Sequence, residues 1–381
     1  MSFAAFDLSP RGRVLFGAGR LAEAGREARS LGFGRTLLVA DAGLVAAGHA
    51  GRAALVLEEA GVEVVPFHDF GPDPDADLVE RGREFAAPLG VDSIFALGGG
   101  SSLDFAKGVN FLLTNGGRVA DYRGYGRAAR PLLPMAGVPT TAGTGSEAQS
   151  YAVVSDARTR EKMACGDPGA AFRLVVLDPD LTHTQPRGVT AAAGFDALAH
   201  AVETSATTKR NALSEVFSRK AWRLLAGSYE RVLARPEDAA GRAAMQLGAY
   251  FAGAAVEASM LGAAHACANP LTARYGTEHG AALATLLPAV VRWNAGHAGE
   301  SYAGLLGTRE RGAAGDAAEA LARRLEEMAA AGGLATRLGA AGVARGDLPR
   351  LASDAARQWT GRFNPRPFDE RGALEIYEWA F

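Results

Sequence analysis

The chain has 381 residues, with 40 Lys and Arg against 42 Asp and Glu, and a formal net charge of −2. This length exceeds the size at which one hydrophobic core keeps growing, so we expect two domains. The balanced charge and the lack of basic runs argue against a nucleic-acid partner.

The cysteines and the apolar segments indicate the cellular compartment in which the protein works. Cys165 and Cys267 are the two cysteines, and they form no CxxC pair. This excludes a disulfide scaffold and suits a reducing cytosol. The first residues lack the pattern of a signal peptide, and no run of about eighteen apolar residues occurs. We therefore expect a cytoplasmic protein with no membrane partner.

Short β-branched segments alternate with amphipathic helical segments from Arg13 to Asp178. This alternation is typical of a parallel sheet covered by helices. The predicted strands are residues 14–16, 36–40, 63–67, 93–97, 135–138 and 174–177. The predicted helices of this part are residues 21–30, 44–59, 76–87 and 103–113.

Strand signals end after Pro186, where Ala, Leu, Glu and Arg recur at helical spacing. The predicted helices here include residues 212–225, 239–258 and 313–330. The segment LTHTQPR breaks the pattern between the two parts. The sequence thus predicts an α/β domain of residues 1–184 and an all-helical domain of residues 185–381.

Four candidate metal ligands lie in two predicted helical segments. Asp196 and His200 are four residues apart in GFDALAHAVE, so a helix places both on one face. His265 and His279 follow in an Ala/Gly-rich stretch, and the chain has only seven histidines. Imidazole and carboxylate ligands argue against calcium or magnesium and suit a first-row divalent metal, with zinc and ferrous iron both open.

Two glycine segments compete for the phosphates of a cofactor. Gly17-Ala18-Gly19 resembles part of a dinucleotide fingerprint, and Asp41 follows about twenty residues later at the end of a strand. The second segment lies between a buried strand and a helix, so its backbone amides would face a pyrophosphate. We prefer this second segment, which comprises Gly98, Gly99, Gly100, Ser101 and Ser102.

These segments resemble those of the iron-containing (group III) alcohol dehydrogenases. GFDALAHAVE, GAAHACANPL and GTEHGAALATLLP are similar to the metal-binding segments of that family, and ALGGGSSLDFAK, VPTTAGTGSE and LDPDL match further upstream. The similarity covers nearly the whole chain. It implies a dehydroquinate synthase-like architecture: a Rossmann-like NAD-binding domain, a helical metal-binding domain, and the active site in the cleft between them.

The resemblance also implies roles for individual residues. Asp41 would bind the adenosine ribose and repel a 2′-phosphate, which favours NAD(H) over NADP(H), unless it only caps the following helix. One divalent metal, Fe²⁺ in preference to Zn²⁺, would be held by Asp196, His200, His265 and His279. The pyrophosphate would lie on residues 98–102, and the remaining cofactor contacts would be Thr140, Thr141, Thr144, Lys162 and Leu181.

The implied function is that of a metal-dependent, NAD(H)-linked alcohol dehydrogenase or aldehyde reductase. It would transfer hydride between nicotinamide C4 and a small alcohol or aldehyde held at the metal. Two positions depart from the family pattern: Asn269 replaces a common substrate-proximal His, and Asp73 replaces the Asn of a cofactor-binding turn. A homodimer is common in the family. The alternatives are a dehydroquinate synthase-type lyase and a catalytically silent cofactor-binding relative.

Overall fold

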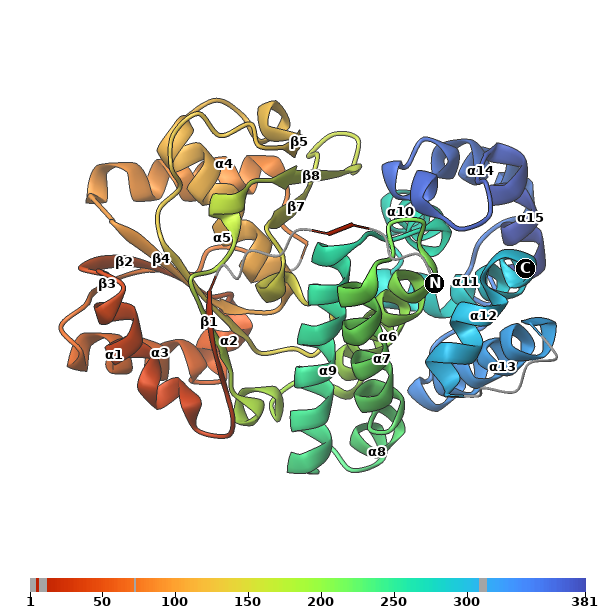
Figure 1. Ribbon diagram of the computed structural model, residues 1–381. Coiled ribbons are helices and arrows are strands. Elements are labelled where there is room, and N and C mark those ends of the chain that lie inside the picture. Colours follow the sequence, from red (N-terminus) through yellow and green to blue (C-terminus); the bar gives the residue numbers. More distant parts are fainter. Residues whose placement is uncertain (1–4, 7–11, 72, 308–313) are drawn as a thin grey trace. The chain divides into compact units, whose positions relative to one another are not determined.

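The computed structural model describes residues 5–6, 12–71, 73–307 and 314–381 (Figure 1). The chain divides into two compact units, and the division falls between Gln185 and Pro186. The predicted first residue of the helix 313–330 lies outside the described residues.

A six-stranded parallel sheet forms the centre of the first unit, with the strand order β1-β9-β6-β4-β2-β3. All six predicted strands are confirmed, and every observed end lies within one residue of the predicted end. The apolar runs of the inner strands are buried, because helices cover both faces of such a sheet, whereas the two edge strands are partly exposed. The strands are β1 (Arg13–Phe16), β2 (Arg35–Val39), β3 (Glu63–Phe67), β4 (Ser93–Gly98), β6 (Met135–Pro139) and β9 (Leu174–Leu177).

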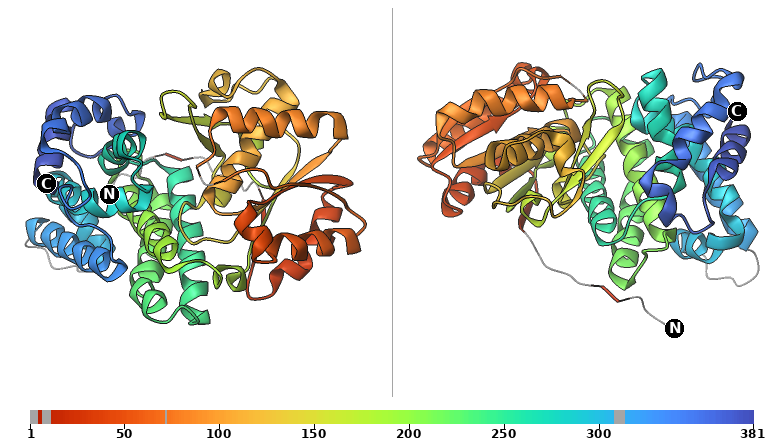
Figure 2. Two further views of the ribbon diagram at one scale, coloured as in Figure 1. Left: turned by 180° about the vertical axis from the view of Figure 1, so that it is seen from behind. Right: turned by 90° about the horizontal axis from the view of Figure 1, so that it is seen from above.

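Helices α1 and α3 lie on one face of this sheet, and α4 and α5 lie on the other (Figures 1 and 2). The prediction of one helix over residues 44–59 is wrong. The chain breaks at Gly48, whose φ of 78° is left-handed and therefore suits glycine. The helices of this unit are α1 (Ala24–Ser30), α2 (Ala42–Ala46), α3 (His49–Glu59), α4 (Ala76–Ala86) and α5 (Gly100–Asn115).

A second, three-stranded sheet was not expected from the sequence. β7 (Tyr151–Ser155) pairs antiparallel with β8 (Lys162–Gly166), and β5 (Gly124–Tyr125) pairs parallel with β8. The β8 sequence KMACG consists of residues with little preference for strands, so it gives no strand signal.

The second unit is built from helices around α6 (Arg187–Ala206), which is buried almost throughout from Thr190 to its end. α6 contacts α7, α9, α11 and α12. The other helices are α7 (Ala212–Ala226), α8 (Tyr229–Ala234), α9 (Ala239–Ala258), α10 (Ala263–Tyr275), α11 (His279–Trp293), α12 (Ala295–Leu306), α13 (Ala314–Gly332), α14 (Leu348–Ala356) and α15 (Glu370–Ala380).

Small residues bring the helices of this unit close together. A Cβ atom added to Gly280 of α11 would lie 2.0 Å from the carbonyl oxygen of Ala192 in α6. The two helices can therefore touch backbone to backbone only because residue 280 has no side chain.

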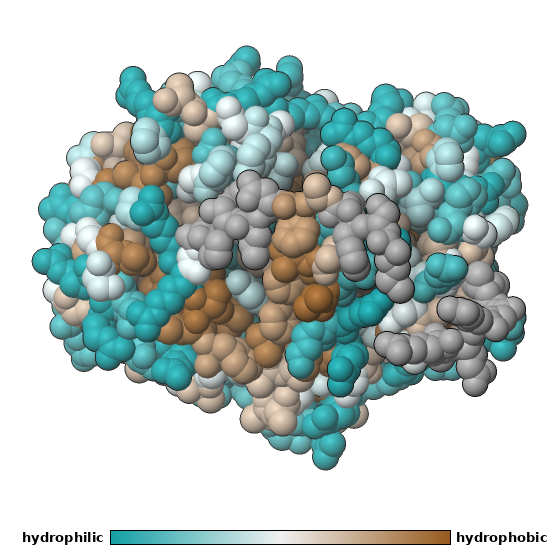
Figure 3. Space-filling view, in the orientation of Figure 1, coloured by the Kyte–Doolittle hydropathy of each residue, from teal (hydrophilic) through white to brown (hydrophobic). Residues whose placement is uncertain are grey.

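The surface of this unit is mixed in character. On the visible face of the molecule, apolar side chains gather along α9 between polar and charged ones (Figure 3). No single helix among the described residues is long and apolar enough to cross a membrane, and α9 and α10 reach that length and composition only as a pair bent by 106°.

Candidate functional site

Three helices of the second unit bring the four predicted metal ligands together. Asp196 and His200 lie one turn apart on α6, as predicted. His265 lies in the first turn of α10, and His279 is the first residue of α11. The stretch that holds the last two histidines is thus two helices instead of one segment, since the chain turns between Tyr275 and His279.

The oxygen Oδ1 of Asp196 lies at the centre of this group. It is 3.4 Å from Nε2 of His200, 3.5 Å from Nε2 of His265 and 4.0 Å from Nε2 of His279. The ligand atoms of Asp196, His265 and His279 all lie within 4.8 Å of one another. In a tetrahedral site with metal–ligand bonds of about 2.1 Å, neighbouring ligand atoms are about 3.4 Å apart. These three ligand atoms could therefore share one small divalent cation, and His200 joins the group through its 3.4 Å contact with Asp196.

Two of these atoms have no hydrogen-bond partner in the described part of the chain. Asp196 Oδ1 and His265 Nε2 are buried and make no hydrogen bond. A buried polar atom without a partner is costly, and a shared cation would satisfy both atoms. The donor set of one carboxylate and three imidazoles thus fits a first-row divalent metal.

The pKa values of Asp196 and His265 also indicate a site for a cation. Burial alone would raise the pKa of Asp196, but the surrounding imidazoles, His200 first, hold it well below its usual value. Burial would lower the pKa of His265, but the carboxylates of Glu203 and Asp196 outweigh this and raise it to about 9. In the metal-free protein a proton on His265 therefore offsets the buried negative charge, and a cation would take the place of that proton.

Glu203 belongs to this site, and the sequence interpretation overlooked it. Its Oε2 pairs with Nδ1 of His265, and its Oε1 accepts a hydrogen bond of 2.7 Å from the amide of Ala264. The available signal was its spacing, because Glu203 lies seven residues after Asp196 and therefore on the same face of α6.

Asn269, one turn after His265 on α10, is partly buried. Its Nδ2 donates a hydrogen bond of 3.0 Å to Oε1 of Gln358. The amide therefore takes part in a side-chain pair where the family often has a titrating imidazole.

The predicted cofactor residues belong to the first unit, where all but Lys162 and Leu181 cluster at the carboxyl ends of neighbouring strands. Asp41 follows β2, the glycine segment follows β4, and Thr140 follows β6. The chain order reverses between β2 and β4, and ligands of parallel sheets bind at such a reversal. A contact of 3.4 Å between Ser102 Oγ and Asp41 Oδ2 joins the first two positions.

The glycine segment packs tightly against the threonines. α5 begins at Gly100 without a side chain that caps it. A Cβ atom at Gly100 would lie 2.4 Å from Cγ2 of Thr144, and one at Gly99 would lie 3.2 Å from Cγ2 of Thr141. Thr140 donates its amide to the carbonyl of Gly98 at 3.0 Å. The structure thus brings together the predicted glycine and threonine positions at the amino end of α5.

The competing glycine segment has its amides occupied. Asp178 accepts hydrogen bonds from the amide of Gly19 at 3.0 Å and from the amide of Leu21 at 2.9 Å. A carboxylate already holds the position that a phosphate would need, which supports the choice of residues 98–102.

Asp41 has the capping role that was the alternative interpretation. It is the N-cap of α2, and its Oδ1 accepts a hydrogen bond of 3.1 Å from the amide of Leu44. Its other oxygen contacts Ser102, as described above. Capping and ribose binding therefore use different oxygen atoms and do not exclude each other.

Lys162 and Leu181 differ in their surroundings. Nζ of Lys162 pairs with the carboxylate of Asp73, whose amide lies 3.2 Å from Oγ of Ser101. Asp73 also adopts a left-handed φ of 52°. Leu181 is fully buried in the apolar core of the sheet, so the structure does not present its side chain beside the other predicted cofactor contacts.

A buried polar network lies under the threonine loop, and the sequence interpretation also overlooked it. Nζ of Lys107 donates to the carbonyl and to Oγ of Ser146, both at 2.8 Å, and Oγ of Ser146 contacts Asp104 at 2.5 Å. Burial raises the pKa of Asp104, and it raises the pKa of the neighbouring Glu147 to about 7. The network fixes the loop after β6 to α5.

Comparison with known proteins identifies the family. Residues 10–179 match the iron-containing alcohol dehydrogenases, and residues 190–381 match the C-terminal part of the Fe-containing alcohol dehydrogenase family. The chain is 32% identical to the NAD-dependent methanol dehydrogenase of Bacillus methanolicus, over 92% of this chain and 93% of that protein. It is also 32% identical to lactaldehyde reductase of Escherichia coli K12, over 96% of this chain and 97% of that protein.

A solved structure shows the same architecture. The crystal structure of a 1,3-propanediol oxidoreductase superposes with a TM-score of 0.94 at 31% identity, over 99% of this chain and all of that chain. These matches do not favour a lyase of the dehydroquinate synthase type. The chain therefore belongs to the iron-containing alcohol dehydrogenase family, and it is an NAD(H)-linked, metal-dependent oxidoreductase of alcohols and aldehydes.

Proposed function

We propose that the protein transfers hydride between nicotinamide C4 and a small alcohol or aldehyde. The substrate oxygen would be held at a metal ion whose ligands are Asp196, His200, His265 and His279. The observation that carries this proposal is the pair of buried atoms without hydrogen bonds, Asp196 Oδ1 and His265 Nε2, which lie 3.5 Å apart. Polar atoms placed in this way suit a cation better than a packed core.

The cation proposed for this site is Fe²⁺, with Zn²⁺ as the alternative. A divalent ion supplies Lewis-acid chemistry to the substrate oxygen, while the nicotinamide carries the hydride. The protein side chains align the ligands: the three imidazoles bring no net charge, and Asp196 brings one negative charge.

For the cofactor, we propose that the backbone of Gly98, Gly99, Gly100, Ser101 and Ser102 holds the pyrophosphate. The amino end of α5 favours an anion there. Asp41 would accept a hydrogen bond from the adenosine ribose and repel a 2′-phosphate, so NAD(H) is favoured over NADP(H). Thr140, Thr141 and Thr144 would face the nicotinamide side. By the resemblance to the family, Lys162 would contact the ribose and Leu181 the nicotinamide.

Asn269 is proposed to lie near the substrate, since it is one turn from the ligand His265. An amide orients a substrate by hydrogen bonding but does not titrate near neutral pH. Proton transfer would therefore use water or ribose hydroxyls.

The substrate class and the setting follow from the same comparison. Relatives named for methanol, lactaldehyde and 1,3-propanediol support a small alcohol or aldehyde as substrate. Two buried free cysteines support a reducing, cytoplasmic compartment. A homodimer is proposed on the pattern of the family, with no nucleic-acid or membrane partner.

A substrate panel tests this proposal. NADH and NADPH oxidation would be followed with C2 to C4 aldehydes after loading the metal-free protein with Fe²⁺ or Zn²⁺. We expect turnover that depends on added metal, is higher with Fe²⁺, and is faster with NADH. Equal turnover without metal, or a preference for NADPH, would contradict the assignment.

A further inference from the structure

Glu203 lies on the same stripe of α6 as two of the ligands. Asp196, His200 and Glu203 are spaced by four and three residues, which places all three side chains on one face of a helix. Glu203 is only 6% exposed. A carboxylate with so little access to water needs strong partners.

Both oxygens of this carboxylate are engaged by α10. Oε1 accepts the amide hydrogen of Ala264 at 2.7 Å, and Oε2 pairs with Nδ1 of His265. The approach is close, because a Cβ atom at Gly262 would lie 3.1 Å from Oε1. Glu203 thus joins the start of α10 to α6 and contacts one metal ligand directly.

This contact decides which nitrogen of His265 is available. When Nδ1 carries the hydrogen that it donates to Glu203, the lone pair of the neutral ring is on Nε2. That nitrogen lies 3.5 Å from Asp196 Oδ1 and makes no hydrogen bond. His200 differs, because its Nδ1 has no hydrogen-bond partner among the described residues.

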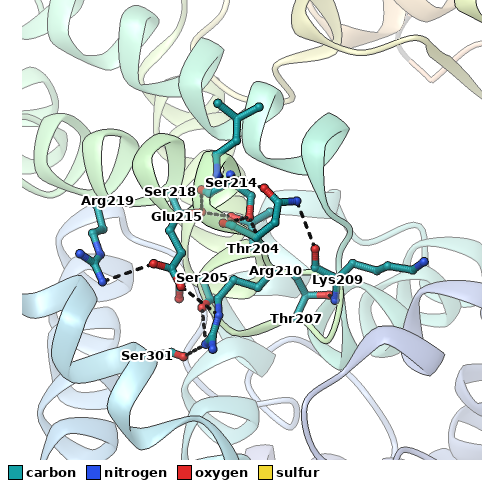
Figure 4. Close-up of polar contacts among 12 residues, drawn as sticks. Thr204, Ser205, Thr207, Lys209, Arg210, Ser214, Glu215, Ser218, Arg219 and Ser301 are labelled. Atoms are coloured by element: carbon teal, nitrogen blue, oxygen red, sulfur yellow. Dashed lines mark hydrogen bonds and ion pairs between the residues drawn. The ribbon is translucent and has the colours of Figure 1, made fainter. Parts of the chain in front are cut away.

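Side-chain hydrogen bonds also hold the backbone around Glu203. Oγ1 of Thr204 bonds to the carbonyl of His200 at 2.6 Å and to Oγ of Ser218 on α7 at 2.8 Å. Arg210 bonds to Ser301 and forms an ion pair with Glu215 in the following corner (Figure 4). These contacts join the end of α6, which carries Glu203, to the neighbouring helices.

We propose that Glu203 is a positioning residue of the metal centre. It selects the Nδ1–H form of His265 and aims Nε2 at the ion, as carboxylates behind metal-bound imidazoles do. The proposal rests on the assignment of the four ligands above. It adds a second negative charge, so one divalent ion with Asp196 and Glu203 makes a buried group of net charge near zero.

The variant Glu203→Gln separates positioning from helix capping. The carbonyl oxygen of Gln can still accept from the amide of Ala264, but its NH2 group cannot accept from His265 Nδ1. His265 is then driven to carry its hydrogen on Nε2, where it blocks the metal. Asn364→Ser is the matched control, because Asn364 Oδ1 caps the adjacent amide of Ala263 at 3.2 Å without touching His265.

The test measures Zn²⁺ affinity by competition with a chelator and the visible absorption of the Co²⁺-loaded full-length protein. We expect Glu203→Gln to bind Zn²⁺ about 10- to 100-fold more weakly and to change the Co²⁺ spectrum. Asn364→Ser should keep both properties within about twofold of the wild type. If Glu203→Gln does not fold, Glu203→Asp, whose shorter carboxylate falls short of His265, is expected to show the same loss.

The outcomes separate the two proposals. Wild-type affinity and an unchanged Co²⁺ spectrum in the Glu203 variants, with metal bound by the wild type, would overturn the positioning role and leave the ligand assignment standing. The same result with a lower melting temperature would make Glu203 a helix cap only. A wild-type protein that binds neither Zn²⁺ nor Co²⁺ would overturn both proposals.

Discussion

The substitution Gly280→Ala tests whether the contact between α6 and α11 sets the geometry of the metal ligands. Gly280 follows the proposed ligand His279, and the facing Ala192 lies one turn before the proposed ligand Asp196. The new Cβ atom would lie 2.0 Å from the carbonyl oxygen of Ala192, whereas ordinary contacts begin at 3.4 Å. The two helices must therefore separate by about 1.4 Å at this point, since a backbone carbonyl cannot rotate away.

A displacement of this size exceeds what the site tolerates. Metal–ligand distances must stay within about 0.2 Å of their ideal values, so we expect Gly280→Ala to lose metal affinity by at least about 10-fold. Overpacking should lower the free energy of unfolding of the metal-free protein by about 1–3 kcal/mol. The measurements are chelator competition with Zn²⁺ and chemical denaturation of the metal-free protein.

The control is Gly188→Ala in the first turn of α6, which is exposed and has no atom within 4 Å of the new Cβ. It should raise the free energy of unfolding by about 0.4–1 kcal/mol, because alanine restricts the unfolded chain. Its metal affinity should stay that of the wild type. Gly280→Ala with wild-type metal affinity would refute the reasoning, because the ligands would then not depend on this contact.

Three further predictions concern the first unit. The pKa of Glu147 is about 7 in the folded protein against 4.5 for a free side chain, so the folded state binds more protons between these values and stability falls as pH rises through this window. The free energy of unfolding falls by about 3 kcal/mol across this window. Glu147→Gln should therefore be more stable than the wild type above pH 7 and equal to it near pH 4.5. A gain in stability that does not vary with pH in denaturation curves would contradict this. For Asp41→Ala, kcat/KM with NADPH should rise relative to NADH, and an unchanged ratio would leave Asp41 as a helix cap only. Asp73→Asn removes the negative charge that pairs with Lys162, which leaves Lys162 available to the cofactor. NADH should therefore bind up to about fivefold more tightly in a fluorescence titration at low salt, because an exposed pair is worth at most about 1 kcal/mol. Weaker binding would give Asp73 itself a role in holding the cofactor.

The sequence was sufficient to single out the four proposed ligands, which the fold brings together, and to predict the main sheet. Asp196 and His200 are readable because helical spacing places them on one face, and histidine is rare enough in this chain for His265 and His279 to stand out. The inner strands of the parallel sheet, β2, β4, β6 and β9, are buried on both faces, so each gives a nearly continuous apolar run. The residues of the second sheet, KMACG above all, give no such signal.

Contacts between distant parts of the chain could not be predicted. Asp178 accepts hydrogen bonds from the amides of Gly19 and Leu21, which lie more than 150 residues earlier in the sequence. No local sequence pattern indicates these bonds. Glu203 is one of many acidic residues in helices, and only the position of α10 reveals its contact with His265. In both cases the site depends on which carboxylate the fold brings close, whereas periodicity reports only the face of one element.

The central claim is that Asp196, His200, His265 and His279 hold one metal ion that turnover requires. The most direct test compares the metal content and the NADH-dependent reduction of small aldehydes in the wild type and in His265→Ala. We expect about one Fe²⁺ or Zn²⁺ per chain in the wild type. His265→Ala should lose both the metal and nearly all turnover, with an unchanged far-ultraviolet circular dichroism spectrum. A His265→Ala protein that keeps its metal and its activity would contradict the account.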